Sequence, residues 1–331
     1  MARVLCITLN PALDLSFNLE ALVLGSVNRP TSAQLEAAGK GVNVARVLAG
    51  LGHEITVSGF LGIDNDAPFA LAAQQLGVAD AFVRVPGNTR INAKLAEQSG
   101  RVTDINGPGM PVGAAHFKAL IATLNTELAS AAPPQAIVMS GSLPPGLSLA
   151  DFSQLMNHLN ASGVPLWVDT SGPALAAAIE SHPTGVKPNE TELAEWAGEE
   201  MTTTQSRLSA AKRLHESGVK HALISAGAEG VLWVNAQGAW HATPPKVVAT
   251  NTVCAGDTFV AGMLHGLLNQ QDGQHSGQYD AEQTLRFATA LSAEAVRHAG
   301  VGNPNAADFD SLLQHTRIRR LDDTITEGAT L

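Results

Sequence analysis

The fold of this chain is decided by one stretch of sequence, Thr252-Val253-Cys254-Ala255-Gly256-Asp257-Thr258-Phe259-Val260-Ala261-Gly262. Small residues lead into a single carboxylate, Asp257, and the apolar residues after it recur at the spacing of a buried helix. A helix that begins near Ala255 directs its free backbone N–H groups and the positive end of its dipole into the space beside these small side chains. The stretch therefore predicts an anion site next to a carboxylate. An ordinary capped helix, packed closely through glycine, is the alternative.

The composition favours helices packed on a sheet. A chain of 331 residues can form one large α/β domain or two smaller ones, and its 31 glycines with only 4% aromatic residues suit that class. The formal net charge of −10 disfavours a general nucleic-acid binder, whose affinity needs a basic surface. A negatively charged ligand would therefore need a local basic pocket.

The cysteines and the N-terminus predict a soluble, cytoplasmic protein. Cys6 and Cys254 lack the spacing of a disulfide or metal motif, so we expect reduced thiols. The first residues do not resemble a signal peptide, and no later apolar run is long enough to span a bilayer. We therefore expect no membrane partner, and the scattered histidines predict no zinc site.

Short apolar runs alternate with helix-like segments along most of the chain. Apolar runs at 4–9 and 55–61 predict strands, and a helix is expected at about 65–76. The same alternation returns after residue 111 and favours a parallel sheet with crossover helices.

Polar residues follow three successive strands in this later part of the chain. They are Ser140 and Ser142, then Asp169, then Lys187 with Asn189 and Glu192. In a doubly wound sheet, ligands bind at the carboxyl ends of the strands. One cleft is therefore expected to collect all three groups.

Two glycine turns precede or follow predicted elements. Gly39-Lys40-Gly41 opens a predicted helix, where Lys40 and Asn43 can reach a ligand, but it has neither P-loop nor dinucleotide-binding spacing. Residues 221–230 predict a strand that runs into a second glycine turn. Neither turn by itself identifies the ligand that it would bind.

Two segments predict a small β lid on the α/β core. Residues 12–35 alternate weakly between polar and apolar, and residues 90–105 predict a hairpin with one polar face. The core then comprises residues 1–11, 37–87 and 108–320, and the lid comprises residues 12–36 and 88–107. A mobile surface loop is expected at 270–283 and a flexible tail at 321–331.

Two long segments resemble the signatures of a known family. Residues 38–45, with glycines at 52 and 62, and residues 251–263 resemble the two signatures of the ribokinase-like sugar kinases, in their phosphofructokinase-B branch. Similarity also covers residues 10–14, 140–146, 187–192 and 225–230, so it spans nearly the whole chain in order.

The resemblance implies a fold and an activity. The implied fold is α/β, a doubly wound and mostly parallel sheet flanked by helices, with a small β-sheet lid. The implied reaction transfers the γ-phosphoryl group of ATP to a sugar hydroxyl. Lys40 and residues 89–95 resemble most closely the members that phosphorylate fructose 1-phosphate at its 6-hydroxyl, which gives fructose 1,6-bisphosphate. Kinases of tagatose 6-phosphate or fructose 6-phosphate are the alternatives.

The resemblance also implies the reacting groups. Asp257 is expected to be the general base, and the backbone N–H groups of Ala255, Gly256 and Asp257, with Cys254, an anion hole. Asn189 and Glu192 are expected to hold Mg²⁺ through its waters, although a helix cap is the alternative for this pair. A non-catalytic sugar-phosphate sensor would require a broken base or metal motif, and both are intact.

Further residues match the family's binding positions. Asp14, Gly39 and Asn43 are expected to contact sugar hydroxyls. The expected phosphate contacts are Lys40, Arg90, Lys94 and Ser140, with Arg29 as a further candidate from a partner subunit. The expected nucleotide contacts are Lys187, Asn189, Ser225, Gly227 and Gly230. A homodimer through the lid is the expected assembly.

Cys254 departs from the family pattern, which has glycine at this position. A side chain here would cost about 1–2 kcal/mol if the backbone needs a positive φ. One interpretation is a redox-sensitive thiol whose pKa is lowered by the helix end. The other is a small residue tolerated in ordinary backbone geometry.

Overall fold

The computed structural model describes residues 1–269 and 279–321. Residues 270–278 of the predicted mobile loop and residues 322–331 of the predicted tail lie outside the described residues. The remainder of that loop differs from the prediction, because a helix already begins at Ala281. Leu321 is buried at the end of a strand, so the ordered core runs one residue beyond the predicted boundary.

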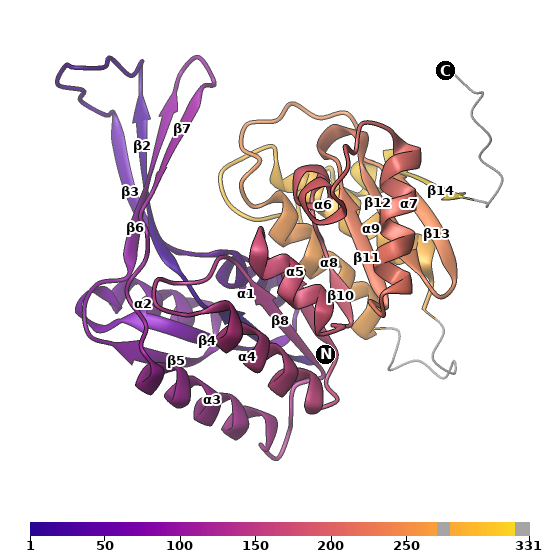
Figure 1. Cartoon of the computed structure of the whole chain (residues 1–331). Helices are drawn as coiled ribbons and strands as arrows, with labels where there is room; N and C mark the ends of the chain where they lie inside the picture. The colour runs from indigo at the N-terminus through magenta and orange to yellow at the C-terminus, as the bar shows by residue number, and fades with distance from the viewer. Residues whose placement is uncertain (270–278, 322–331) are drawn as a thin grey trace.

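A ten-stranded sheet forms the centre of the molecule (Figure 1), with the order β14-β13-β12-β11-β10-β9-β8-β1-β4-β5. The strands from β11 to β5 pair in parallel, and β12, β13 and β14 extend the sheet antiparallel. This confirms the predicted, mostly parallel sheet. The strands are β1 (Arg3–Thr8), β4 (Glu54–Gly62), β5 (Ala79–Val85), β8 (Ala136–Ser140), β9 (Leu166–Asp169), β10 (Gly185–Val186), β11 (His221–Ser225), β12 (Val231–Asn235), β13 (Gly238–Thr243) and β14 (Arg317–Leu321).

Helices cover both faces of this sheet, because its strand residues alternate between two apolar clusters. Val4 and Cys6 of β1 belong to one cluster, and Leu5 and Ile7 to the other. The first cluster includes residues of α1 (Lys40–Gly50), α2 (Ala67–Leu76), α8 (Ala255–Asn269), α9 (Ala281–Ala295) and α10 (Phe309–His315). The second includes residues of α3 (Ala114–Leu128), α4 (Leu149–Ala161), α5 (Pro173–Glu180), α6 (Glu190–Ala197) and α7 (Thr204–Glu216). The doubly wound arrangement is confirmed.

A separate four-stranded sheet, which we call the lid, stands away from the large sheet at the upper left of Figure 1. Its strands lie in the order β3 (Ser32–Ala38), β2 (Ala12–Leu19), β6 (Arg90–Glu97) and β7 (Val102–Asn106). One face carries a cross-strand row of apolar residues, and the other carries Asp14 opposite Asn92. The predicted small β sheet is therefore present.

The remaining elements are short or were not predicted. Two 3-10 helices lie at Ile63–Asn65 (η1) and Gly227–Glu229 (η2). The strands β5 and β14 and the helices α7 and α10 were not predicted from the sequence. None of the helices in the described ranges is long and apolar enough to cross a membrane.

The two central helices on the first face, α8 and α9, approach closely through a glycine. A Cβ atom added to Gly262 of α8 would lie 2.7 Å from Ala288 Cα of α9. Gly50, the last residue of α1, offers a matched control, because a Cβ there would meet nothing within 4 Å.

We predict opposite effects of the same substitution at these two glycines. Gly262→Ala should lower the free energy of unfolding by about 1–3 kcal/mol, because α9 has to move. Gly50→Ala should raise it by about 0.4–1 kcal/mol by restricting the unfolded chain. Denaturant unfolding of both variants measures this, and similar effects at the two sites would contradict the close packing.

Candidate functional site

The first turn of α8 forms the centre of the candidate site. The helix begins at Ala255, as predicted, and Asp257 in its first turn is only 3% exposed. Thr258 N donates to Cys254 O, and Ser292 Oγ of α9 donates to Ala255 O at 2.9 Å. The neighbouring helix thus fixes the start of α8, where backbone N–H groups favour an anion.

Asp257 is a buried carboxylate whose environment favours its protonated form. Asn43 Nδ2 of α1 donates to Asp257 Oδ2 at 2.8 Å. Burial and then the negative charge of Asp169 raise the pKa of Asp257 to about 7, against the opposing effects of Asn43, Lys40 and Lys187. A base poised near neutral pH is suited to proton transfer.

Asp169 was expected in the cleft as a polar strand end, but it was not among the predicted reacting or binding residues. This buried carboxylate ends β9 and lies between two lysines: Lys40 Nζ is 3.3 Å from Oδ1, and Lys187 Nζ is 3.5 Å from Oδ2. Burial alone would raise the pKa of Asp169, but the charges of Lys187 and Lys40 hold it below its ordinary value. The sequence signal for Asp169 was its place at a strand end, beside the other polar strand ends.

The two lysines connect this carboxylate to the start of α8. A Cβ atom at Gly256 would lie 3.2 Å from Lys187 Nζ, so the ammonium group borders the glycine of the predicted anion hole. Ser140, which ends β8, is paired in register with Asp169. Its buried Oγ has no hydrogen-bond partner among the described residues, so it remains a donor.

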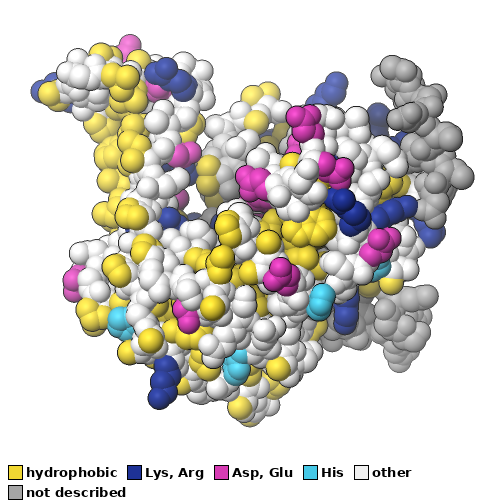
Figure 2. Space-filling model, in the orientation of Figure 1, with side chains coloured by type: hydrophobic (Ala, Val, Ile, Leu, Met, Phe, Trp, Pro, Cys, Tyr) yellow, Lys and Arg dark blue, Asp and Glu magenta, His cyan; other side chains and the backbone are white. Residues whose placement is uncertain are grey.

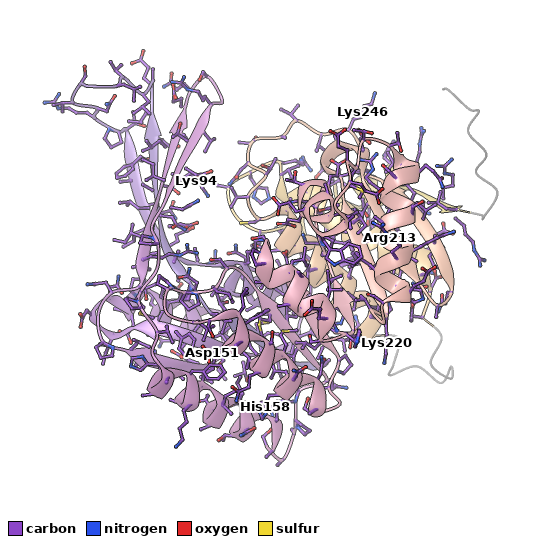
Figure 3. All side chains as sticks on the ribbon, in the orientation of Figure 1. Lys94, Asp151, His158, Arg213, Lys220 and Lys246 are labelled. Atoms are coloured by element: carbon purple, nitrogen blue, oxygen red, sulfur yellow. The ribbon has the colours of Figure 1, made fainter. Side chains whose placement is uncertain are left out.

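The lid contributes a second charged group. Asn92 Nδ2 donates to Asp14 Oδ1 at 3.0 Å, and Lys94 Nζ lies 3.9 Å from Asp14 Oδ2. Lys94 lies on the side of the lid that faces the large sheet (Figure 3). Asn92 was not predicted, although it lies directly across from Asp14 in the register of β2 and β6.

Two predicted phosphate contacts have other surroundings in the structure. Arg90 donates to the carbonyl oxygens of Asn10, Pro11 and Gly107, at 2.9, 3.3 and 3.1 Å, and so fastens the base of the lid. Burial lowers the pKa of Arg90. Arg29 is exposed in the lid's 20–31 loop, which lies at the end of the lid away from the large sheet (Figure 1).

The predicted metal pair forms a reciprocal helix cap, the alternative that the sequence left open. Asn189 Oδ1 accepts from Glu192 N, and Glu192 Oε2 accepts from Asn189 N, both at 2.9 Å. Glu192 Oε1 takes no part in this cap. Within residues 1–269 and 279–321, no three His, Cys, Asp or Glu side chains gather into a metal-ligand cluster.

The predicted nucleotide turn and the start of α8 line one cavity. Ser225, Gly227 and Gly230 line it together with Ala255 and Gly256, and its volume is about 620 Å³. Gly227 and Gly230 have φ angles of 51° and 102°, which glycine adopts at no steric cost. Residues far apart in the sequence thus surround one space beside Asp257.

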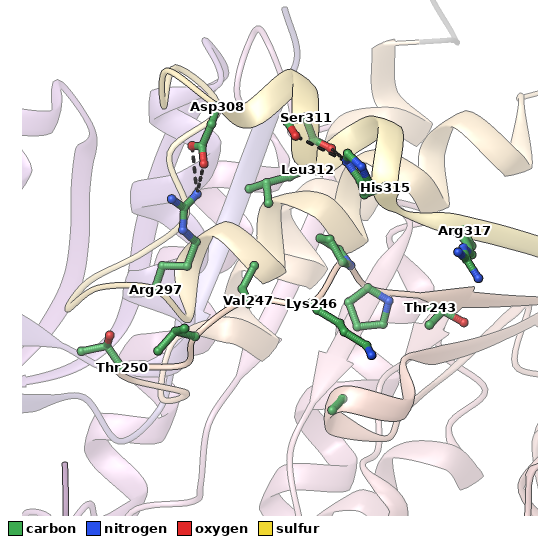
Figure 4. Close-up of a pocket in the computed structure, with 14 residues that line it drawn as sticks. Thr243, Lys246, Val247, Thr250, Arg297, Asp308, Ser311, Leu312, His315 and Arg317 are labelled. Atoms are coloured by element: carbon green, nitrogen blue, oxygen red, sulfur yellow. Dashed lines mark hydrogen bonds and ion pairs between the residues drawn. The ribbon is translucent and has the colours of Figure 1, made fainter. Parts of the chain in front are cut away.

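A larger cavity of about 980 Å³ adjoins this one, and the segment 244–247 lines both. Figure 4 shows it between Lys246, Arg297 and Arg317, and an ion pair of 2.9 Å joins Arg297 to Asp308. None of the predicted site residues lines this larger cavity, so its volume does not identify it as the functional site.

The structure decides between the two interpretations of Cys254. Burial and the charge of Asp257 raise the pKa of its thiol to about 11, which contradicts the interpretation of a thiol whose pKa is lowered by the helix end. The only described non-glycine residue with a positive φ is His182. Cys254 therefore sits in ordinary backbone geometry without the anticipated cost.

Comparison with known proteins agrees with this geometry. The model of the pfkB family carbohydrate kinases matches residues 1–308. The chain belongs to this family. It is 43% identical to the 1-phosphofructokinase of Vibrio cholerae, over 98% of both chains, and 42% identical to that of Escherichia coli K12, over 91% of this chain and 93% of the other.

A solved structure shows the same fold. Phosphofructokinase-2 from Escherichia coli, in complex with substrates and products, superposes with a TM-score of 0.85 at 28% identity, and the match covers 94% of this chain and 98% of the other. The protein is therefore a carbohydrate kinase, and ATP is the phosphate donor that this family implies.

Proposed function

We propose that this kinase phosphorylates fructose 1-phosphate at its 6-hydroxyl, with ATP as donor, to give fructose 1,6-bisphosphate. The observation that carries the proposal is the placement of Asp257, a buried carboxylate with a pKa of about 7, at the anion-binding start of α8. The choice of acceptor is supported by the 1-phosphofructokinase relatives, which match nearly the full chain.

Asp257 acts as the general base in this proposal. Phosphoryl transfer passes through a loose transition state, so the protein mainly positions groups and neutralises charge. Asp257 orients the acceptor hydroxyl and accepts its proton late in the transfer. The backbone N–H groups of Ala255, Gly256 and Asp257, beside Cys254, stabilise the charge of the transferred group, and the Lys187 ammonium lies next to them.

Asn189 and Glu192 fit an indirect magnesium site. The free Oε1 of Glu192 can accept hydrogen bonds from the ion's waters without breaking the helix cap. The absence of a preformed ligand cluster among the described residues suits Mg²⁺, which keeps several waters and takes phosphate oxygens as ligands. When bound, the ion neutralises charge on the ATP phosphates.

The sugar phosphate lies between the lid and α1 in this proposal. Asp14, Asn43 and the backbone at Gly39 contact its hydroxyl groups. Its phosphate interacts with Lys40, Lys94 and Ser140, with Arg90 at the base of the lid. ATP occupies the 620 Å³ cavity between the Ser225–Gly230 turn and α8, near Asn189.

We predict that the enzyme prefers fructose 1-phosphate, and that Lys40 contributes to this preference. An ADP-release assay should give a higher kcat/KM for fructose 1-phosphate than for fructose 6-phosphate or tagatose 6-phosphate. Lys40→Gly should raise the KM for fructose 1-phosphate about tenfold or more and change the KM for ATP less, because a charged phosphate contact contributes about 1.5–3 kcal/mol. A preference for either other sugar phosphate would overturn the proposed acceptor.

The control for this assay is Asp257→Asn, which keeps the size of the side chain and removes the base. Its kcat should fall about 100- to 10,000-fold, while ATP still binds. Near-normal turnover of this variant would reject Asp257 as the base. If the wild-type protein bound sugar phosphate without releasing ADP, a non-catalytic sensor would replace the proposed enzyme.

We further propose that the apolar face of the lid pairs two subunits. Leu35, Leu15, Ala93 and Ile105 form a row across its four strands, and Leu35, Ile91 and Ile105 are exposed. Figure 2 shows hydrophobic side chains along the outer side of the lid. Exposed apolar residues on one face of a sheet are stabilised when the same face of a second copy of the chain covers them. This pairing would let Arg29 reach the partner's site.

We predict that the protein is a dimer and that a charge on the apolar face separates it. Sedimentation velocity of Ile105→Asp should show monomers, because the carboxylate would be buried in the interface. Val102→Asp is the matched control: it is also exposed on β7, but in the register of the opposite face, and it should remain dimeric. A monomeric wild type, or equal behaviour of both variants, would contradict the lid interface.

A further inference from the structure

A buried guanidinium lies behind the nucleotide side of the site. The side chain of Arg207, in the first part of α7, is only 4% exposed and pairs with two carboxylates, those of Glu190 and Glu229. A buried charge is tolerated only where it is paired and hydrogen-bonded. Arg207 therefore depends on both partners.

Glu190 and Glu229 do not depend on Arg207 in the way that Arg207 depends on them. The side chain of Glu190 is 39% exposed and that of Glu229 is 68% exposed, so water can reach both. Both glutamates would therefore be solvated without Arg207. Their pairing with Arg207 instead holds in place the two segments that carry them.

Those two segments carry the proposed metal pair and the proposed nucleotide turn. Glu190 is the first residue of α6, directly after Asn189 and two residues before Glu192. Glu229 ends η2, directly before Gly230. Arg207 thus joins the start of α6 to the glycine turn, from outside the cavity that the turn lines.

The same segments are also joined by their backbones. Ser225 N donates to Pro188 O at 3.1 Å, and Asn189 and Ser225 form a parallel bridge. Beyond this bridge the two segments diverge, one into α6 and the other into η2. The Arg207 guanidinium spans the gap, and its rigid fork can hold two carboxylates at once, which a lysine ammonium cannot do with the same geometry.

We propose that Arg207 is a positioning residue for the ATP–metal complex. It fixes the distance between the Asn189–Glu192 pair and the Ser225–Gly230 turn, so that one ATP molecule can contact both. This inference rests on the proposed function, which assigns the metal to the first segment and the nucleotide to the second. Arg207 itself touches neither ligand.

The test compares Arg207→Met with Arg213→Met in the full chain. Methionine keeps most of the buried volume but cannot hold the carboxylates. Arg213 is the matched control, because it lies on the same helix in a half-exposed ion pair of 2.8 Å with Glu199, away from the nucleotide turn. Arg207→Met should raise about tenfold both the KM for MgATP and the Kd for MgATP, the latter measured by calorimetry without sugar phosphate, equivalent to about 1.4 kcal/mol, with the KM for sugar phosphate unchanged. Arg213→Met should change neither, and Arg207→Lys should lie between.

Two results would overturn this role. One is an equal rise of both KM values in Arg207→Met, which indicates general loosening. The other is an Arg213→Met variant that behaves like Arg207→Met. If Arg207→Met fails to fold, Glu229→Gln replaces it: this exposed change should raise the KM for MgATP about threefold, and an unchanged value rejects the role of Arg207.

A further variant separates this inference from the proposed function. Glu192→Gln should raise the Mg²⁺ concentration needed for half-maximal rate. If it does not, the metal assignment fails, whatever Arg207→Met shows. If it does, and Arg207→Met still leaves the KM for MgATP unchanged, only the positioning role fails.

Discussion

The site depends on the burial of Asp257 and, next to it, on the repulsion between Asp257 and a second buried carboxylate, Asp169. Neither side chain is exposed to water that could screen its charge, so ionisation of one carboxylate disfavours ionisation of the other. Asp169 takes the negative charge because Lys187 and Lys40 pair with it. Asp257 has one hydrogen bond from Asn43 and remains near its protonation midpoint at neutral pH. Three charged side chains thereby give a carboxylate the properties of a base.

The fold supplies these groups from distant parts of the sequence. Asp169 ends a strand and Lys187 follows the next one, so the parallel sheet brings both to one edge. Lys40 opens α1 and Asp257 lies in the first turn of α8, and these helices pack together on one face. The start of α8, with its free N–H groups, is thus held beside a lysine and an ionised carboxylate. Changes in the packing of α8 on α1 or α9 should therefore alter the positions of these catalytic groups.

Much of this could be predicted from the sequence, and the misses have physical reasons. The parallel sheet, the lid strands and the start of α8 followed from hydrophobic periodicity and glycine turns. The helix α7 was missed because its buried face carries only two large apolar residues, Leu208 and Leu214, and is completed by two alanines and the charged Arg207. The strand β14 was missed because arginines occupy this edge strand. Asp169 stood at a predicted strand end, but its pairing with two lysines is a property of the folded sheet. The raised pKa of the Cys254 thiol is likewise set by burial, which the sequence does not display.

The central claim is that Asp257 is held near its protonation midpoint at neutral pH by burial and by the charge of Asp169. NMR titration of aspartate labelled with ¹³C at the carboxyl carbon measures this directly, with Asp257→Asn to assign the signal. We predict an apparent pKa of about 7 for Asp257 in the wild-type protein and a lower value in Asp169→Asn, which lacks the repelling charge and releases both lysines. An Asp257 signal that titrates near the ordinary aspartate value of about 4, or that is unchanged by Asp169→Asn, would contradict the account.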